Sequence, residues 1–411
     1  MTNSTTLDLD FVRRQFPNLG NGWAYFENAG GSYLPQSVVQ RMTAFMTESQ
    51  LQPYALNPLS QLSTERLETA RRLMAEMINA GPDEIVIGPS TTLNVYVLAQ
   101  ALRPLLAAGD EIIVTNQDHE ANSGAWRRLD EFGVAIREWR IDPVSGELDL
   151  AGLDALLDER TRLVCLPHVS NIVGSINPIL EVTAKVHAAG AMVCVDAVAY
   201  AAHRLMDVKA LDVDFYLFSL YKLYGPHIAL LYAKRGHIAA ARNQNHFFHE
   251  HNLPAKLNPG GLNYEAVASL VGIVDYFEAL HDCHFDHPAN DLQGRLARVF
   301  GLIARQEEDL ARHFLDYLSG KAGVRLIGRS DPDRTRRVPT FSFVVEGRRP
   351  PEIVEALGRE RIAISHGHFY AHRCVEGLGI DPEPGVVRAS MLHYNTLHEV
   401  DRLIEALDKA I

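Results

Sequence analysis

The chain has 411 residues, of which 47% are hydrophobic and 22% charged, a composition typical of a soluble globular protein of two or three domains. Its 39 Lys and Arg against 51 Asp and Glu give a net charge of −12 without any block of like charge, which argues against nucleic-acid and membrane-surface partners. No apolar run reaches the ~18 residues of a membrane span, the first ten residues lack a signal-peptide pattern, and four cysteines are too few for a disulfide framework, so we expect a cytoplasmic protein.

Short apolar segments alternate with amphipathic ones between about residues 63 and 234. The expected strands are 84–88, 111–115, 134–140, 162–166, 192–196, 215–219 and 228–233. The expected helices between them are 92–102, 121–131, 150–158 and 180–189. Apolar strands that alternate with helices predict an α/β fold with a mostly parallel sheet, of the seven-stranded type, covered on both faces.

The remaining sequence predicts a long helical connection and a smaller α+β layer. Helical patterns fill residues 264–318. After them we expect strands at 324–327, 339–345 and 387–392, and helices at 351–359 and 397–411. We therefore predict a large domain over residues 16–288 and a small C-terminal domain over residues 289–411, with residues 1–15 packed on the small domain.

Two residues at expected strand ends carry the strongest chemical signal. Asp196 ends the apolar segment MVCVD, which places a carboxylate at the edge of a parallel sheet where ligands bind. Lys222 follows the next expected strand, among apolar and aromatic residues, an environment that favours Schiff-base chemistry. A carboxylate at the neighbouring strand end is what a pyridinium nitrogen needs. Taken alone, each has an ordinary alternative, a helix-capping aspartate and a surface lysine.

Two further segments follow expected strands. Gly88-Pro-Ser-Thr-Thr-Leu-Asn94 leads into an apolar helix, and the N–H groups and hydroxyls at such a helix start can bind a phosphate, although simple N-capping explains them equally well. His119, in Gln117-Asp-His-Glu-Ala-Asn122, could stack on a planar cofactor or be an ordinary loop histidine.

The order and spacing of these segments resemble the class V aminotransferase and cysteine desulfurase-like family of pyridoxal 5′-phosphate (PLP) enzymes, of fold type I. The resemblance extends from Tyr25-Phe-Glu-Asn-Ala-Gly30 to Glu399-Val-Asp-Arg-Leu403. Its most specific parts are Lys222-Leu-Tyr-Gly-Pro226 and Val169-Ser-Asn-Ile-Val-Gly174.

The resemblance implies roles for individual residues. Lys222 would form the internal aldimine with PLP and move protons, Asp196 would pair with the pyridine nitrogen, and His119 would stack on the ring. The residues implied to hold the phosphate are Thr91, Thr92 and Ser219, with Gly261 reaching it from a neighbouring subunit. Asn171 and Arg388 would hold the substrate, Arg388 through its α-carboxylate. The family builds its active sites at a dimer interface, so a homodimer is implied, with Asn258-Pro-Gly-Gly-Leu-Asn263 as the loop that reaches the neighbour.

The sequence departs from the family pattern at several positions. Ala199 replaces a glutamine, Tyr221 a histidine, and Gly261 the threonine of the neighbour's phosphate loop. In the loop Ile364-Ser-His-Gly-His-Phe-Tyr370-Ala, Tyr370 replaces the persulfide-carrying cysteine of the desulfurases and Ser365 an arginine. Cys374 comes four residues later, in an expected helical turn.

The first hypothesis is therefore a PLP-dependent enzyme that acts on a small amino acid by transamination or by elimination at Cβ, including C–S cleavage. The alternatives are a true desulfurase with Cys374 as persulfide carrier, and a PLP-fold binding protein without turnover. Two histidine-rich segments, residues 246–251 and 281–287, lack the spacing of established metal motifs, so we expect no metal site.

Overall fold

The computed structural model describes residues 6–286, 289 and 291–411 and divides into two compact units. The first unit comprises residues up to Asn18, Ser32–Leu106 and Arg204–Leu302. The second comprises Leu19–Gly31, Ala107–His203 and Ile303–Ile411. The domain boundary expected near Pro288 falls on a residue outside the described part, so the division into residues 16–288 and 289–411 stays a prediction.

The first unit combines a helical layer with three antiparallel strands. Its strands run in the order β2-β8-β7, namely β2 (Ile85–Gly88), β8 (Ala229–Ala233) and β7 (Phe215–Ser219). Its helices are α1 (Leu9–Arg14), α2 (Gln36–Glu48), α3 (Pro58–Met77), α4 (Thr91–Leu102), α8 (Arg235–Ala240), α9 (Leu253–Lys256), α10 (Tyr264–Ser269) and α11 (Val271–His284).

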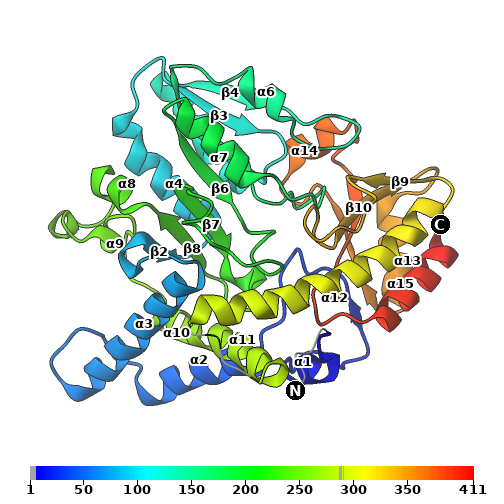
Figure 1. Ribbon diagram of the computed structural model, residues 1–411, viewed down its shortest axis with the longest axis horizontal. Helices are drawn as coiled ribbons and strands as arrows, with labels where there is room; N and C mark the ends of the chain where they lie inside the picture. The colour runs from blue at the N-terminus through cyan, green and yellow to red at the C-terminus, as the bar shows by residue number, and fades with distance from the viewer. Residues whose placement is uncertain (1–5, 287–288, 290) are drawn as a thin grey trace. The chain divides into compact units, whose positions relative to one another are not determined.

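Four of these helices, α2, α3, α10 and α11, pack together, as Figure 1 shows. Gly272 makes the contact of α11 with α2 possible, because a Cβ atom there would lie 2.5 Å from the backbone of Val38. The start of the chain is fixed to the same layer, since the Asp8 backbone N–H donates to Nε2 of His284 at 2.8 Å. This contact is with α11, which precedes the expected boundary; the expected packing of residues 1–15 on the small domain stays a prediction.

The second unit contains four parallel strands in the order β6-β5-β3-β4. They are β3 (Glu111–Thr115), β4 (Ala135–Trp139), β5 (Thr161–Pro167) and β6 (Met192–Asp196), with helices α6 (Leu150–Asp154) and α7 (Ile179–Ala188) between them in the chain. Apart from the outer strand β4, they are almost wholly buried, as the apolar pattern predicts for a covered parallel sheet. The carboxyl ends of these strands lie at one edge of the sheet, and β6 ends there at Asp196.

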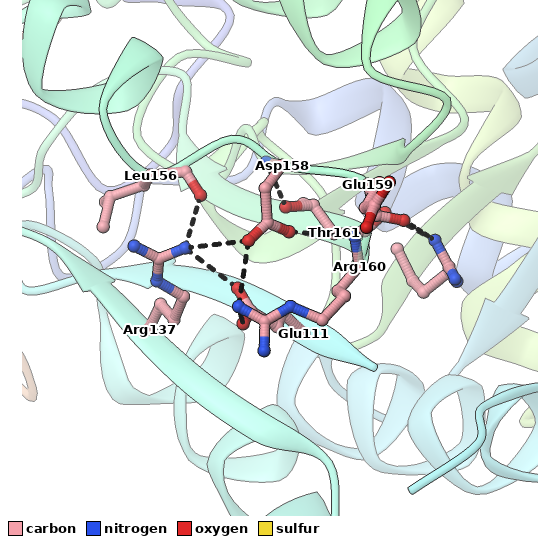
Figure 2. Close-up of polar contacts among 8 residues, drawn as sticks. Glu111, Arg137, Leu156, Asp158, Glu159, Arg160 and Thr161 are labelled. Atoms are coloured by element: carbon pink, nitrogen blue, oxygen red, sulfur yellow. Dashed lines mark hydrogen bonds and ion pairs between the residues drawn. The ribbon is translucent and has the colours of Figure 1, made fainter. Parts of the chain in front are cut away.

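Ion pairs hold the opposite edge, where β3 and β5 begin (Figure 2). Buried Glu111 accepts from Arg137 at 3.0 Å and pairs with Arg160 at 2.6 Å. Asp158 pairs with Arg160 at 3.0 Å and with Arg137 at 3.6 Å. Because Glu111 is buried, loss of one arginine would leave its charge incompletely paired, so the network stabilises the alignment of β3, β4 and β5.

The C-terminal part of the second unit is an α+β layer. Its antiparallel sheet has the order β12-β13-β10-β9, and a short parallel pair joins β1 (Ala24–Tyr25) to β11 (Ile362–Ala363). The sheet strands are β9 (Val324–Ile327), β10 (Thr340–Val345), β12 (Ser365–Gly367) and β13 (Val386–Ser390). The helices are α13 (Pro350–Arg359), α14 (His372–Gly377) and α15 (Leu397–Ala410), preceded by the long α12 (Leu292–Gly320), whose residues up to Leu302 belong to the first unit. In Figure 1, α13 and α15 lie side by side, and they share one apolar core.

The strands predicted at 192–196, 215–219 and 324–327 match the structure to the residue. The helix predicted at 121–131 is wrong: this segment forms η3 (Glu120–Asn122), α5 (Gly124–Arg127) and η4 (Arg128–Phe132). The ring of His119 accepts from the backbone N–H of Ala121, and such side-chain bonds compete with a regular helix.

No helix among the described residues is long and apolar enough to cross a membrane.

Candidate functional site

Asp196 lies at the carboxyl edge of the second unit's parallel strands, where the sequence predicted it. Its buried carboxylate accepts the backbone N–H of Val198 at 2.8 Å. Its backbone oxygen accepts the N–H of His168 at 2.7 Å, which ties the end of β6 to the segment after β5. One backbone N–H thus holds the carboxylate, and a second holds the main chain of the same residue.

His119 precedes η3, and its ring orientation is set by a backbone contact. Nδ1 accepts the N–H of Ala121 at 3.0 Å, so in the neutral ring the proton is on Nε2. The ring centroid lies 5.3 Å from that of Tyr370 at an interplanar angle of 35°. The backbone contact thus fixes the orientation of the ring, and its stacking on a cofactor stays a prediction.

Arg388 and Asn171 meet in the second unit. Arg388 lies on β13, is 3% exposed, and donates from Nη1 to the backbone oxygen of Asn171 at 3.2 Å. Burial lowers the pKa of Arg388 to about 10, which still leaves it charged at neutral pH. Among the described residues, Nε of Arg388 and Oδ1 of Asn171 are buried without a hydrogen-bond partner. An anion with an adjacent ammonium group would satisfy both atoms.

Phe369 covers one face of the Arg388 guanidinium, at 3.6 Å from its central carbon to the ring centroid. The backbone oxygen of Phe369 accepts from Nδ2 of Asn171 at 2.9 Å. A cation–π contact supports a desolvated guanidinium without neutralising it, so the charge stays available to an anion.

The loop that contains Phe369 and Tyr370 is strained and anchored. Both residues are in the left-handed region, with φ of 49° and 60°. The backbone oxygen of Tyr370 accepts the N–H of Glu120 at 2.8 Å, and the side chain of Glu120 pairs with Arg373 at 3.1 Å. Two adjacent residues of this kind persist only where surrounding contacts hold them. Tyr370, which the family resemblance places where the desulfurases carry their cysteine, is 70% exposed.

Cys374 is on α14, the helix that follows this loop in the chain. It is fully buried in an apolar cluster with Ile172, Val173 and Leu378. Burial raises the pKa of its thiol to about 12, and a contact with Ser170 lowers it only in part. The thiol is therefore protonated at neutral pH and closed off from solvent.

In the first unit, the structure brings Thr91 and Ser219 together. Thr91 opens α4, Ser219 ends β7, and their hydroxyl oxygens lie 2.8 Å apart in a buried position. Ser90 caps the helix by accepting the N–H of Leu93 at 3.2 Å, so the sequence alternative of N-capping holds for Ser90. Thr92 is exposed. Gly88 allows the side chain of Asn94, on α4, to lie against the end of β2, because a Cβ at Gly88 would lie 1.9 Å from Oδ1 of Asn94.

Lys222 ends η5 (Leu220–Lys222), directly after β7, and is half-buried. Its Nζ lies 5.8 Å from the ring centroid of Tyr221, which stacks on His227 at 4.6 Å. Ser32 fixes the turn, because its N–H donates to the oxygen of Tyr221 and its hydroxyl accepts the N–H of Tyr224. The lysine thus projects from a turn that is bonded on both sides.

Gly261 lines a pocket of about 200 Å³ with Gly88, Pro89, His227 and Asn258. Nδ2 of Asn258 donates to the oxygen of Ile87 at 3.1 Å, which fixes the loop 258–263 beside the start of α4. The role of Gly261 toward a neighbouring subunit stays a prediction.

The histidine-rich segment 281–287 contains a histidine that the structure uses for packing of the fold. Both ring nitrogens of His284 bond to backbone, at Asp8 and Leu280, so this histidine is structural. His287, in the same segment, lies outside the described residues. Within the part of the chain that the structure describes, no three His, Cys, Asp or Glu side chains are grouped as metal ligands.

Sequence reasoning missed Phe369 and Asp118. Phe369 is 19 positions from Arg388 and shows no pattern that links the two. Asp118 is part of the Gln-Asp-His-Glu segment, and its place three residues after the apolar strand β3 was the signal that could have identified it.

The comparisons with known proteins agree with these features. The sequence profile of the family described as Aminotransferase class-V matches residues 24–293 and 297–403. The "Aminotransferase-like protein FGM3" of Gibberella zeae is 38% identical over 422 residues, with all of both chains covered. The "Cysteine desulfurase-like protein ustD" of Aspergillus flavus is 35% identical, over 98% of this chain and 91% of that protein.

Among solved structures, the cysteine desulfurase CsdA of Escherichia coli is similar with a TM-score of 0.83 and 27% identity, over 98% of each chain. The similarity confirms the fold predicted from the sequence. The chain therefore belongs to the class V aminotransferase family, the PLP-dependent enzymes of fold type I that include the cysteine desulfurase-like proteins.

Proposed function

We propose that the protein acts on a small amino acid by transamination or by elimination at Cβ, with C–S cleavage as the lyase form. The observation that carries the proposal is the Arg388–Asn171 pair. The guanidinium of Arg388 is buried and charged, and it lies beside the amide of Asn171. Among the described residues, Nε of the arginine and Oδ1 of the asparagine have no hydrogen-bond partner. This pair complements the carboxylate and the amino group that every α-amino acid carries.

The residues of each unit fit PLP. The Thr91 and Ser219 hydroxyls, at the N-terminus of the twelve-residue helix α4, suit a phosphate group. Asp196 supplies a buried carboxylate for the pyridine nitrogen, and His119 supplies an oriented ring for stacking. When bound, PLP supplies an electron sink for the negative charge that develops at the substrate Cα.

The roles of the side chains follow from their positions. Arg388 holds the substrate carboxylate, and Asn171 accepts from its amino group through Oδ1. Lys222 attaches the cofactor and moves the proton at Cα. Phe369 excludes water from one face of Arg388, which strengthens its grip on the carboxylate. That both units act on one cofactor is part of the proposal.

Cys374→Ser tests the desulfurase alternative. We expect the variant to keep most of the wild-type turnover, within about threefold, because a fully buried thiol with a pKa of about 12 is not a nucleophile. The measurement is product analysis with a panel of small amino acids, cysteine included, at neutral pH. Tyr370→Phe is the companion variant, since it leaves the anchored loop and the aromatic ring in place and removes only the hydroxyl group.

The other outcomes identify the alternatives. Alanine and persulfide formed from cysteine, and lost in Cys374→Ser alone, would establish the persulfide mechanism and contradict the proposal. Cofactor binding without turnover of any amino acid in the panel would support the binding protein.

We further propose that the working form is a homodimer with shared active sites. The loop 258–263 carries Gly260, with φ of 97°, and Gly261, and neither would bring a Cβ within 4 Å of another atom of this chain. Glycines in such open positions allow another backbone to approach closely. Sedimentation of the purified protein at micromolar concentration should give a dimer; a fully active monomer would refute shared sites.

A further inference from the structure

Asp118 is a buried carboxyl group that the roles above leave unused. It follows β3 by three residues and is 4% exposed. Oδ2 accepts from Nδ2 of Asn122 at 2.8 Å, whereas Oδ1 is buried without a hydrogen-bond partner among the described residues. An ionised carboxylate has about four acceptor sites to satisfy, so this environment favours the neutral acid.

A short chain of buried side chains links Asp118 to Asp196. Oδ1 of Asn122, which holds Asp118 through its amide nitrogen, accepts from the Cys194 thiol at 3.5 Å. Cys194 and Asp196 are two residues apart on β6 and therefore face the same side of the sheet. Because β3, β5 and β6 are parallel, both carboxyl groups lie at the same sheet edge.

The charges around Asp118 act in the same direction. Burial, and next the negative charge of Asp196, raise the pKa of Asp118 well above its usual value; Glu120 adds to this, while Asn122 and the backbone of His119 oppose it. Among the described residues, the thiols of Cys165 and Cys374 also interact with the charge of Asp118. Burial raises the pKa of Cys165 and Cys374, and Cys194 pairs with Cys165 across β5 and β6.

The two carboxyl groups differ in what stabilises their charge. Asp196 accepts a backbone N–H from Val198. Oδ1 of Asp118 has no donor among the described residues. Two neighbouring carboxyl groups in a buried site cannot both ionise at low cost, and the unpartnered Oδ1 makes Asp118 the less favourable site for the charge, although its Oδ2 accepts from Asn122.

We propose that Asp118 is a positioning residue of the cofactor's nitrogen site, a second and neutral carboxyl group that confines the negative charge of the pair to Asp196. The inference rests on the proposed pairing of Asp196 with the pyridine nitrogen. As the pH rises, Asp118 releases its proton to solvent before the nitrogen does, and its new negative charge then helps to retain the proton on the nitrogen. Asp118 thus widens the pH range in which the electron sink works.

The first arm of the test uses the protein without cofactor. A protonated carboxylic acid and a carboxylate differ in their infrared carbonyl bands, so the difference spectrum between wild type and Asp118→Asn at neutral pH should show the loss of one protonated acid. An exposed carboxylate of the same unit, in Asp154→Asn, is the matched control and should show the loss of a carboxylate. Loss of a carboxylate band in Asp118→Asn would overturn the proposal.

Stability gives a second readout with a defined sign. If the pKa of Asp118 is higher in the folded than in the unfolded protein, this group stabilises the fold fully at a pH below ~3.9, the ordinary pKa of Asp. The stabilisation is lost as the pH rises through the folded-state pKa. Between these two pKa values, the titration of Asp118 should raise the unfolding equilibrium constant of the wild type about tenfold per pH unit. Asp118→Asn should lack this part of the pH dependence of stability, and Asp118→Glu should keep a similar one.

The second arm uses the protein loaded with PLP. At neutral pH, Asp118→Asn should still bind PLP, because both side chains are neutral. The alkaline transition of the cofactor absorbance should move to lower pH by about one unit in Asp118→Asn, and Asp118→Glu should restore it. Should Asp118→Asn fail to fold, Asp118→Ser makes the same comparison.

The outcomes separate the inference from the proposed function. An unmoved alkaline transition in a variant that binds PLP would overturn the inference and leave the proposed function standing. Absence of PLP uptake by the wild type would overturn both, while the infrared arm would still locate the proton of Asp118.

Discussion

Lys222→Ala should lose the covalent attachment of PLP and lower turnover by about 10⁴-fold, the largest effect expected of any single substitution. The lysine is the one group proposed both to attach the cofactor and to move the proton at Cα, and an alanine can do neither. The measurement is absorbance of the purified protein, followed by borohydride reduction and mass spectrometry of the labelled peptide. In the wild type the label should be on the peptide that contains Lys222.

The control for this variant is Lys209→Ala, an exposed lysine of the same unit. It should keep both the label and the activity. A wild-type protein that is colourless and takes up no added PLP would contradict the whole proposal, and label on a lysine other than Lys222 would contradict the assignment of that residue.

Asp196→Ala should lower kcat by about 10³-fold while retaining a measurable part of the PLP affinity. Its carboxylate is proposed to keep the pyridine nitrogen protonated, and loss of a preorganised charge at a reacting group costs far more in the transition state than in the bound ground state. The phosphate contacts of Thr91 and Ser219 would remain, so the cofactor would still bind. Titration with PLP and steady-state kinetics on the same preparation separate the two effects.

Asp154→Ala is the corresponding control, because Asp154 is exposed and pairs only with Lys185 among the ion pairs of the described residues. It should leave both quantities unchanged. An Asp196→Ala enzyme that lost binding and kcat in equal proportion would mean that Asp196 serves to bind the cofactor and not to activate it.

The sequence by itself determined the elements whose residues carry their own signal. The strands at 192–196 and 215–219 are short apolar runs, and such runs have few conformations that bury them other than the centre of a sheet. Asp196 and Lys222 could be identified because Asp196 ends such a strand and Lys222 lies in the turn after another, where the chain leaves the sheet. The family resemblance rested on these same positions and is confirmed by the matches along the whole chain.

Only the tertiary structure decided what depends on residues distant in the chain. The burial of Cys374, which argues against its use as a persulfide carrier, comes from packing against Ile172 and Val173, some 200 positions away. The cover of Phe369 on Arg388 requires two adjacent left-handed residues, which local preferences disfavour and only the contacts with Asn171 and Glu120 maintain. Likewise the pKa of Asp118 is raised by burial and next by the charge of Asp196, 78 positions later in the sequence. Propensity and hydrophobic pattern act over a few residues, whereas desolvation and Coulomb interaction act through space, so strands could be predicted from the sequence and the charge states of the site could not.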